Sequence, residues 1–336
     1  MPHPSPFHTL ETVVWTDSAD APSVTVFRPH HTPEGVPGEG GGPSGQPGIG
    51  GRPLPPGRIP QALPFVYVHL AREEAALFHG KQAEWEAAHG PFPALLVAIT
   101  GNDWERDFTP WPAPRLFRGS PDFAGGADAC LARLTNTLVP AVETRLAGEG
   151  FVPSLRFLAG YSLAGLFALY ALYASPTKAG ADASTDASAD GPGLFTGCVC
   201  GSPSVWYPGF REFALARPVA PSWRFFHGSV GDREGKAKNP RLAPIEDNLR
   251  AVTEHLRNQG VHTVFQLHAG GHFQDPPRAA LARRGSRRRL ERQRPGSHPD
   301  DSLTGCRERA APSDRYAATA RTLSSGPIFS PAPPLS

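Results

Sequence analysis

The stretch LAGYSLAGL, residues 158–166, places Ser162 among small residues between two apolar segments. Residues 154–159 are typical of a strand, and residues 163–174 are apolar and favour a helix. The motif departs from Gly-x-Ser-x-Gly by one position, because Ala164 stands at the second glycine and Gly165 follows it. Small neighbours suit a strained strand-to-helix turn that projects a serine hydroxyl above a sheet. We therefore predict that Ser162 is a nucleophile; taken alone, the motif also fits a tight helix start with serine as the N-cap.

Strands and helices are predicted to alternate around this motif. Short apolar runs predict strands at residues 64–70, 94–100, 154–159, 195–200, 223–230 and 262–268. Apolar spacing predicts helices at residues 131–146, 163–174 and about 244–259. This alternation is typical of an α/β fold, a mostly parallel sheet flanked by helices. We assign residues 64–277 to one catalytic domain and residues 1–28 to its N-terminal strands.

Three stretches lack the composition of a packed core. Residues 29–63 are rich in glycine and proline and predict a disordered linker or insertion. Residues 176–193 are small, polar and acidic, and predict a low-complexity surface loop. Residues 278–336 form an Arg/Pro/Ser-rich tail that we predict to be disordered. Because its composition changes abruptly near residue 278, we also consider a shifted reading frame, which resequencing would test.

Composition gives no sign of a charged macromolecular partner. The net charge is only +2, which favours neither nucleic acid nor a membrane surface. The four cysteines, Cys130, Cys198, Cys200 and Cys306, lack metal-binding spacing and are expected to be buried free thiols. The N-terminal sequence has no signal-peptide pattern, and there is no long apolar run, so we expect a soluble cytoplasmic protein. Neither a metal nor a cofactor is expected, and the oligomeric state is left open.

A serine nucleophile needs a base and an acid, which in this fold follow in the order Ser, acid, His. His272 follows two glycines after the last predicted strand, and we predict that it is the base. Four other histidines, in strand or helix positions, are expected to be structural: His69, His227, His255 and His268. Glu234 is the preferred acid and Asp232 the alternative, since both follow the strand at 223–230. The backbone N–H of Leu163 is predicted to face the oxyanion.

Four segments together resemble an esterase family of α/β-hydrolases that includes esterase D-like, antigen 85-like and ferric-enterobactin-esterase-like proteins. They are GYSLAGLFALY (160–170), GSPSVWYPGF (201–210), GDREGKAKNP (231–240) and GGHFQDP (270–276). The resemblance covers about residues 94–276 and implies an α/β-hydrolase fold and a cofactor-free carboxylic ester hydrolase. A siderophore-esterase-like hydrolase that acts on a small-molecule ester is one form of this predicted activity. The family pattern after the penultimate strand places the acid at Glu234.

The loop at residues 103–111 resembles the family's loop beside the active site. Arg106, Asp107 and Trp111 there are candidates for substrate binding, as is Tyr161; an internal Arg–Asp pair that braces the loop is the alternative. The chain departs from the family after the strand at 64–70, where relatives often carry Asp-Gly. We therefore place the second oxyanion donor at the backbone near Ala71.

Other functions remain as alternatives. The motif SPTK at residues 175–178 resembles the Ser-x-x-Lys motif of penicillin-recognising enzymes, but no Lys-Thr-Gly follows. The arginine-rich run at 278–294 would bind nucleic acid without sequence specificity, because it has no interleaved aromatic residues. A catalytically impaired esterase homologue is the third alternative, since relatives continue after the histidine loop with a helix that packs on the sheet.

Overall fold

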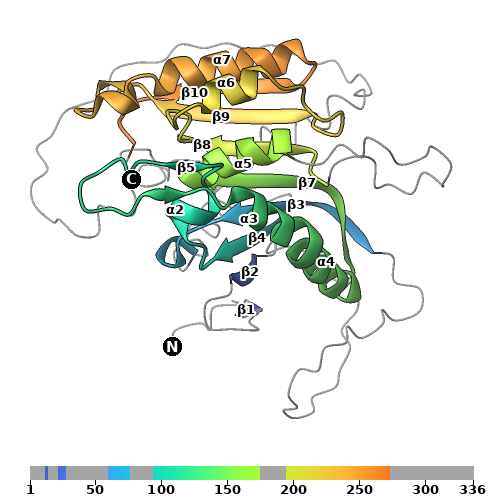
Figure 1. Ribbon diagram of the computed structural model, residues 1–336. Helices are drawn as coiled ribbons and strands as arrows, with labels where there is room; N and C mark the ends of the chain where they lie inside the picture. Colours follow the sequence, from blue (N-terminus) through green and yellow to red (C-terminus); the bar gives the residue numbers. More distant parts are fainter. Residues whose placement is uncertain (1–11, 14–21, 28–59, 76–93, 175–193, 273–336) are drawn as a thin grey trace, which may run out of the picture.

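The computed structural model describes residues 12–13, 22–27, 60–75, 94–174 and 194–272 (Figure 1). The strands are β1 (Thr12–Val13), β2 (Ser23–Phe27), β3 (Gln61–His69), β4 (Leu95–Thr100), β5 (Pro112–Ala113), β6 (Phe123–Ala124), β7 (Phe151–Tyr161), β8 (Gly197–Gly201), β9 (Phe225–Gly231) and β10 (His262–His268). The α-helices are α2 (Trp104–Asp107), α3 (Ala127–Arg133), α4 (Val139–Gly148), α5 (Leu163–Ala174), α6 (Phe210–Leu215) and α7 (Ile245–Asn258). Shorter helical turns are the π-helical η1 (Leu134–Leu138) and the 3₁₀ segments η2 (Glu234–Lys236) and η3 (Pro240–Leu242).

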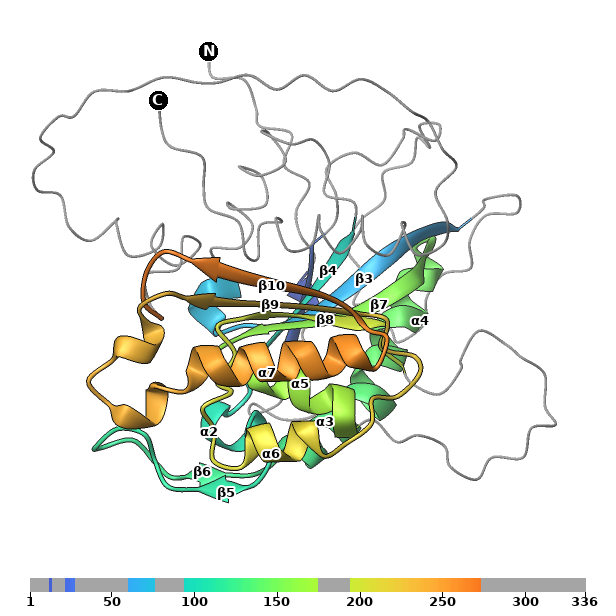
Figure 2. The same ribbon diagram turned by 90° about the horizontal axis from the view of Figure 1, so that it is seen from above.

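Eight of the described strands form one sheet in the order β1-β2-β4-β3-β7-β8-β9-β10, and β5 and β6 pair antiparallel in a separate two-stranded sheet. The pairs from β4 to β10 are parallel, whereas β1 and β2 pair antiparallel at one edge. Helices α3, α5 and α7 lie on the same side of this sheet (Figure 2). The predicted α/β architecture is therefore confirmed. The predicted loop at 176–193 and tail at 278–336 lie outside the described residues, as does the predicted linker up to residue 59.

Alternate residues of the central strands supply two apolar clusters, one on each face of the sheet. In β3, Phe65 and Tyr67 belong to the cluster beneath α5, whereas Val66 and Val68 belong to the opposite cluster. This division follows from the two-residue period of a strand. Helix α5 contributes ten buried residues in a row, which explains why its sequence is apolar on all sides.

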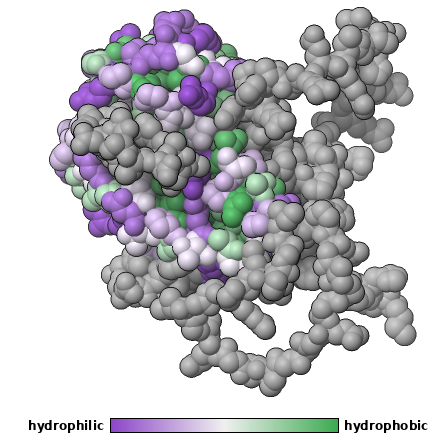
Figure 3. All heavy atoms as spheres, turned by 90° about the vertical axis from the view of Figure 1, so that its right-hand side faces the viewer, coloured by the Kyte–Doolittle hydropathy of each residue, from purple (hydrophilic) through white to green (hydrophobic). Residues whose placement is uncertain are grey.

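Helix α7 shows the contrasting amphipathic pattern. It buries Leu249, Val252 and Leu256, and its exposed side carries charges such as the Glu246–Arg250 pair. In Figure 3 the upper part of the described surface is accordingly largely hydrophilic. This part lies at the height of α7 in Figure 1. A surface helix of this kind needs only one apolar face to pack on the sheet.

Several predicted elements differ in their bounds, and two of these differences have a clear physical reason. Strand β3 begins at Gln61, before the predicted start at residue 64, because residues 61–63 pair with the first residues of β7. A register shift at Leu63/Pro64 accommodates the proline, which cannot donate to a ladder. The predicted helix 131–146 is divided by η1, just before Pro140, which lacks the N–H that a regular helix would need there.

Cys130, Cys198 and Cys200 are free and buried, as predicted, and Cys306 lies outside the described residues.

Among the helices that the structure describes, none is both long and apolar enough to cross a membrane.

Candidate active site

Ser162 occupies a sharp turn between β7 and α5, and its backbone is left-handed with φ of 58°. Its N–H donates to the carbonyl of Gly201 at 3.0 Å, which ties the turn to β8. A Cβ at Gly160 would lie 2.4 Å from the backbone of Ala164, so only glycine fits there. At Gly165, a Cβ would lie 3.1 Å from the Cα of Pro203. The glycine at 160 therefore lets the backbone of α5 approach β7, and the glycine at 165 lets the loop at Pro203 approach closely.

The hydroxyl of Ser162 meets His272 and, through it, Glu234. His272 Nε2 lies 2.9 Å from Ser162 Oγ, and His272 Nδ1 lies 2.7 Å from Glu234 Oε2. The other carboxylate oxygen, Oε1, accepts from Ser202 Oγ at 2.5 Å and from the N–H of Gly231 at 2.8 Å. The structure therefore brings together the serine, base and preferred acid in one hydrogen-bonded line.

Opposing effects act on the pKa of Glu234. Burial, which leaves the residue 4% exposed, raises the pKa and is the largest single effect. Hydrogen bonds from His272, Ser202 and Gly231, together with the charge of the imidazole, outweigh it and hold the pKa below its ordinary value. The carboxylate is therefore ionised at neutral pH and is suited to orient the imidazole.

No protein-family model matches the chain. A relative from Bacillus subtilis, the uncharacterized protein YbbA, is 26% identical over 203 residues, which are 59% of this chain and 72% of the relative. Two solved structures from Aspergillus nidulans are similar across most of the chain. The siderophore hydrolase EstB has a TM-score of 0.53 at 20% identity and covers 84% of this chain and 95% of its own. The siderophore hydrolase EstA has a TM-score of 0.52 at 18% identity and covers 81% and 91%. The chain has the α/β-hydrolase fold.

Asp232, the alternative acid, does not contact the imidazole of His272. Its Oδ1 accepts from the N–H of Gly270 at 2.8 Å, and its own N–H donates to the carbonyl of His268 at 2.9 Å. The carboxylate thereby braces the loop that carries His272. The geometry favours Glu234 over Asp232 as the partner of the histidine.

Two serines after β8 approach the site, and the sequence reasoning gave neither of them a role. Ser202 is fully buried, has φ of 40° and donates to Glu234. Ser204 is also fully buried; its Oγ lies 3.4 Å from that of Ser162, and its N–H donates to the carbonyl of Ser162 at 3.0 Å. The available signal was the GSPS segment at 201–204, which contributed to the family resemblance.

Tyr161 holds the histidine loop instead of lining the cavity. Its hydroxyl donates to the main-chain carbonyl of His272, and the two ring centroids are 5.1 Å apart. Tyr161 therefore contacts the loop that carries the histidine, and its assignment to substrate binding stays a prediction.

The two predicted oxyanion donors differ in their surroundings. Leu163 is the first residue of α5 and lines the cavity beside Ser162, and the first N–H groups of a helix have no acceptor within the helix. The N–H of Ala71 instead donates to Glu74 Oε2 at 3.1 Å. Strand pairing of His69 with Gly160 places the ends of β3 and β7 at the same edge. The role of Ala71 stays a prediction, with Glu74 as a competing acceptor.

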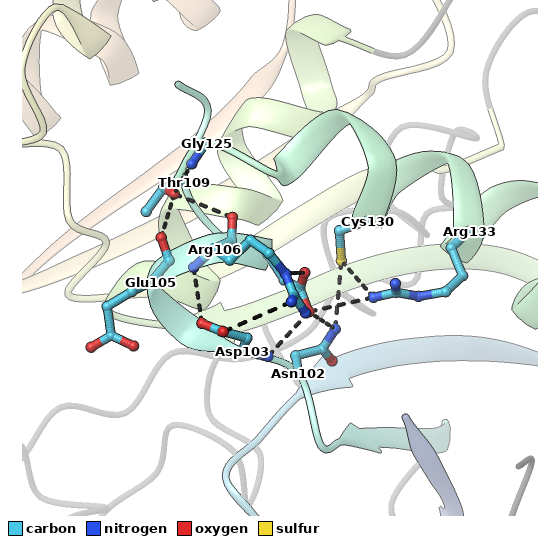
Figure 4. Close-up of polar contacts among 9 residues, drawn as sticks. Asn102, Asp103, Glu105, Arg106, Thr109, Gly125, Cys130 and Arg133 are labelled. Carbon is cyan, nitrogen blue, oxygen red and sulfur yellow. Dashed lines mark hydrogen bonds and ion pairs between the residues drawn. The ribbon is translucent and has the colours of Figure 1, made fainter. Parts of the chain in front are cut away.

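The loop after β4 is braced internally (Figure 4). Buried Asp107 accepts from Asn102 Nδ2 at 3.2 Å, from the N–H of Asp103 at 3.1 Å and from Arg106 Nε at 3.0 Å. Arg133 approaches the same carboxylate at 3.5 Å. The alternative interpretation, an Arg–Asp pair within the loop, therefore describes Arg106 and Asp107 correctly.

Trp111 is likewise anchored away from the cavity, because its Nε1 donates to the carbonyl of Pro208 at 2.9 Å. Glu105 is the residue of α2 that lines the cavity, and its side chain points away from the cluster in Figure 4. The polar groups of Arg106, Asp107 and Trp111 are engaged within the protein, and substrate binding by these residues stays a prediction.

Two of the histidines expected to be structural are buried in the sheet. His69 contacts Asn102 through Nδ1 at 3.2 Å and packs edge-on against Phe108 and Phe167. Burial lowers the pKa of His69 to about 4, and it does the same for His227. Both imidazoles are therefore neutral near pH 7.

Ser162 and His272 open onto a cavity of about 730 Å³. Its walls come from the β5–β6 hairpin, the segment from Arg233 to Ile245, and Trp206. Among the described residues, no group of three or more His, Cys, Asp or Glu side chains is arranged to hold a metal.

Proposed function

We propose that the protein is a carboxylic ester hydrolase that works through Ser162, His272 and Glu234 and an acyl-enzyme intermediate. The observation that carries the proposal is the line from Ser162 Oγ through His272 to Glu234, with the serine at the wall of a cavity. Similar lines of hydroxyl, imidazole and carboxylate occur on unrelated folds and are identified by geometry and roles.

In the proposed reaction His272 Nε2 takes the proton of Ser162 as its oxygen bonds to the ester carbonyl carbon. The N–H of Leu163 stabilises the resulting oxyanion, a contribution of about 3–4 kcal/mol for one such donor. The imidazolium returns the proton to the leaving alcohol, and the acyl group stays on the serine. Water, deprotonated by His272, then attacks the acyl-enzyme and releases the acid. Glu234 keeps the Nδ1 proton in place throughout.

Hydrolysis of p-nitrophenyl acetate and butyrate by the full chain tests this proposal. Ser162→Ala and His272→Ala should each lower kcat by about three orders of magnitude or more. His255→Ala is the matched control, because its Nε2 lies 3.1 Å from the carbonyl of Arg217, outside the site, and its rate should be unchanged. Equal rates in all four proteins would refute the assignment.

The acyl-enzyme has a separate test. A pre-steady-state burst of p-nitrophenol equal to the enzyme concentration is expected, together with an acyl mass increment on the peptide that contains Ser162. A linear time course without a labelled peptide would contradict the covalent step.

As the finer substrate class we propose esters of the siderophore type. Support comes from the siderophore hydrolases EstB and EstA, which share the fold. Incubation with hydroxamate and catecholate siderophores that contain ester bonds, followed by chromatography of the products, tests this class. Intact siderophores after complete turnover of p-nitrophenyl butyrate would exclude it and leave the esterase proposal standing.

A further inference from the structure

The cavity beside Ser162 is enclosed by two segments that are distant in sequence. One is the loop of the β5–β6 hairpin, residues 114–122, and the other contains η2 and η3 (Figure 2). Asn239 Nδ2 donates to the carbonyl of Leu116 at 3.1 Å, and the Arg241 guanidinium donates to that of Arg115 at 2.7 Å. These bonds fix the hairpin loop as one wall of the cavity.

The hairpin loop is also closed on itself. Arg115 Nε lies 2.9 Å from Asp122 Oδ1, which also accepts from the N–H of Arg115 at 3.0 Å. Asn239 Oδ1 in turn accepts from the N–H of Arg241 at 3.1 Å, at the start of η3. Both walls are therefore held in place by the protein's own bonds before any substrate binds, which reduces the cost of ordering them on binding.

The lining of this preformed cavity is dominated by aromatic and aliphatic side chains. Phe123 and Trp206 lie side by side with ring centroids 6.1 Å apart, and Leu242 and Ile245 belong to the same lining. Phe117 projects from the hairpin loop and is 54% exposed. A large exposed phenyl ring at the wall of a reactive cavity is suited to cover an apolar ligand.

The charges in the lining do not indicate which substrate group the cavity would hold. Arg233 and Lys238 are opposed by Glu105 in the lining, so the walls carry no single sign. Size and ring chemistry are more informative. A dry cavity of roughly 150 Å³ holds benzene, whereas this cavity measures about 730 Å³. Space therefore remains for a group much larger than an acetyl or butyryl chain.

We infer that the cavity is a subsite for a bulky aromatic group of the ester substrate, about the size of two fused rings, held between Phe117 and Trp206. This inference rests on the proposed esterase function and specifies its substrate class. Aromatic rings are favoured over alkyl chains of equal volume, because offset or edge-to-face contacts with Phe and Trp add to the burial of apolar area.

The test compares esters of matched volume, with acid release followed in a pH-stat. Ethyl 2-naphthylacetate carries the ring on the acyl side and 2-naphthylmethyl acetate on the alcohol side. Ethyl decanoate and decyl acetate are the alkyl counterparts, and ethyl acetate is the small reference. At least one naphthyl ester should exceed its alkyl counterpart in kcat/KM by about threefold to tenfold and ethyl acetate by at least about tenfold.

Two variants connect this preference to the proposed walls. Phe117→Ala should lower the naphthyl-to-ethyl-acetate ratio of kcat/KM by at least about threefold, and its side chain is too exposed to be essential for folding. Asn239→Ala should lower the same ratio by loosening the hairpin loop. Arg118→Ala is the matched control, since Arg118 is exposed in the same loop and does not line the cavity, and it should leave the ratio unchanged.

Binding of 2-naphthylacetamide, measured calorimetrically on Ser162→Ala and on Ser162→Ala/Phe117→Ala, provides a readout that needs no turnover. Weaker binding in the double variant supports the subsite. Ser162-dependent hydrolysis with no naphthyl preference, or equal binding by both variants, would overturn the subsite while the esterase proposal stands. Absence of Ser162-dependent hydrolysis of every ester would overturn the esterase proposal and the substrate assignment with it.

Discussion

The substitution Glu234→Gln tests whether the carboxylate of Glu234 decides which ring nitrogen of His272 carries the proton. In the native site Oε1 faces two donors, Ser202 and the N–H of Gly231, whereas Oε2 faces His272 Nδ1. A glutamine must keep its carbonyl oxygen toward the fixed N–H of Gly231, so its NH₂ group is turned toward the histidine. Nδ1 is then forced to accept, and the imidazole proton moves to Nε2, which faces Ser162.

That tautomer cannot take a proton from the serine. The equivalent loss in a Ser-His-Asp hydrolase is on the order of 10⁴ in kcat, which corresponds to about 5 kcal/mol of transition-state stabilisation. We expect a loss of this size for Glu234→Gln on p-nitrophenyl butyrate, with KM changed by less than about threefold because the carboxylate does not bind substrate. Steady-state kinetics at pH 7–8 measure both parameters, and circular dichroism checks the fold.

Asp232→Asn is the matched control. An asparagine keeps an oxygen that can accept from the N–H of Gly270, the contact that Asp232 makes at 2.8 Å. Its kcat should therefore stay within about threefold of the wild-type value. The reasoning is wrong if Glu234→Gln keeps more than a tenth of the activity, or if Asp232→Asn shows the larger loss.

Three further outcomes are expected. Ser202→Ala removes a hydrogen bond that lowers the pKa of Glu234, so the acid limb of the pH profile of kcat/KM should move to higher pH. Burial lowers the pKa of His69 and His227 from 6.5 to about 4, so the folded protein holds both histidines neutral where the unfolded chain would protonate them. Their contribution to the free energy of unfolding is therefore full above pH 6.5 and decreases as the pH falls toward 4. Urea unfolding should show a loss of about 2 kcal/mol per histidine between pH 7 and 5. Gly160→Ala would place a Cβ 2.4 Å from the backbone of α5, so thermal and urea unfolding should reveal a loss of about 1–3 kcal/mol.

The elements that could be predicted from sequence are those whose burial determines their composition. Helix α5 and strand β10 agree with the predicted ranges 163–174 and 262–268. The positions of Ser162, Glu234 and His272 could also be anticipated, because each follows a strand of a parallel sheet, and the ends of such strands share an edge.

The remaining features depend on contacts between distant segments. Ser202 meets Glu234 across 32 positions, and Trp111 is anchored to Pro208 across 97 positions. The sequence near Arg106 fitted both a substrate contact and an internal pair, and only the three-dimensional surroundings distinguish them. No local pattern states which distant partner a polar side chain will find.

Ser162 and Ser202 both have a left-handed backbone, and they hold the site together from the ends of two neighbouring strands. Ser162 and Ser202 follow the last residues of β7 and β8, and those last residues are paired in register. A non-glycine residue with this backbone costs about 1–3 kcal/mol of strain, and glycine would remove the strain but also the hydroxyl. Each N–H continues the ladder, Ser162 to Gly201 and Ser202 to Ser229. One hydroxyl meets His272 Nε2 and the other meets the carboxylate on the Nδ1 side, so two adjacent strand ends hold opposite ends of the same hydrogen-bonded line.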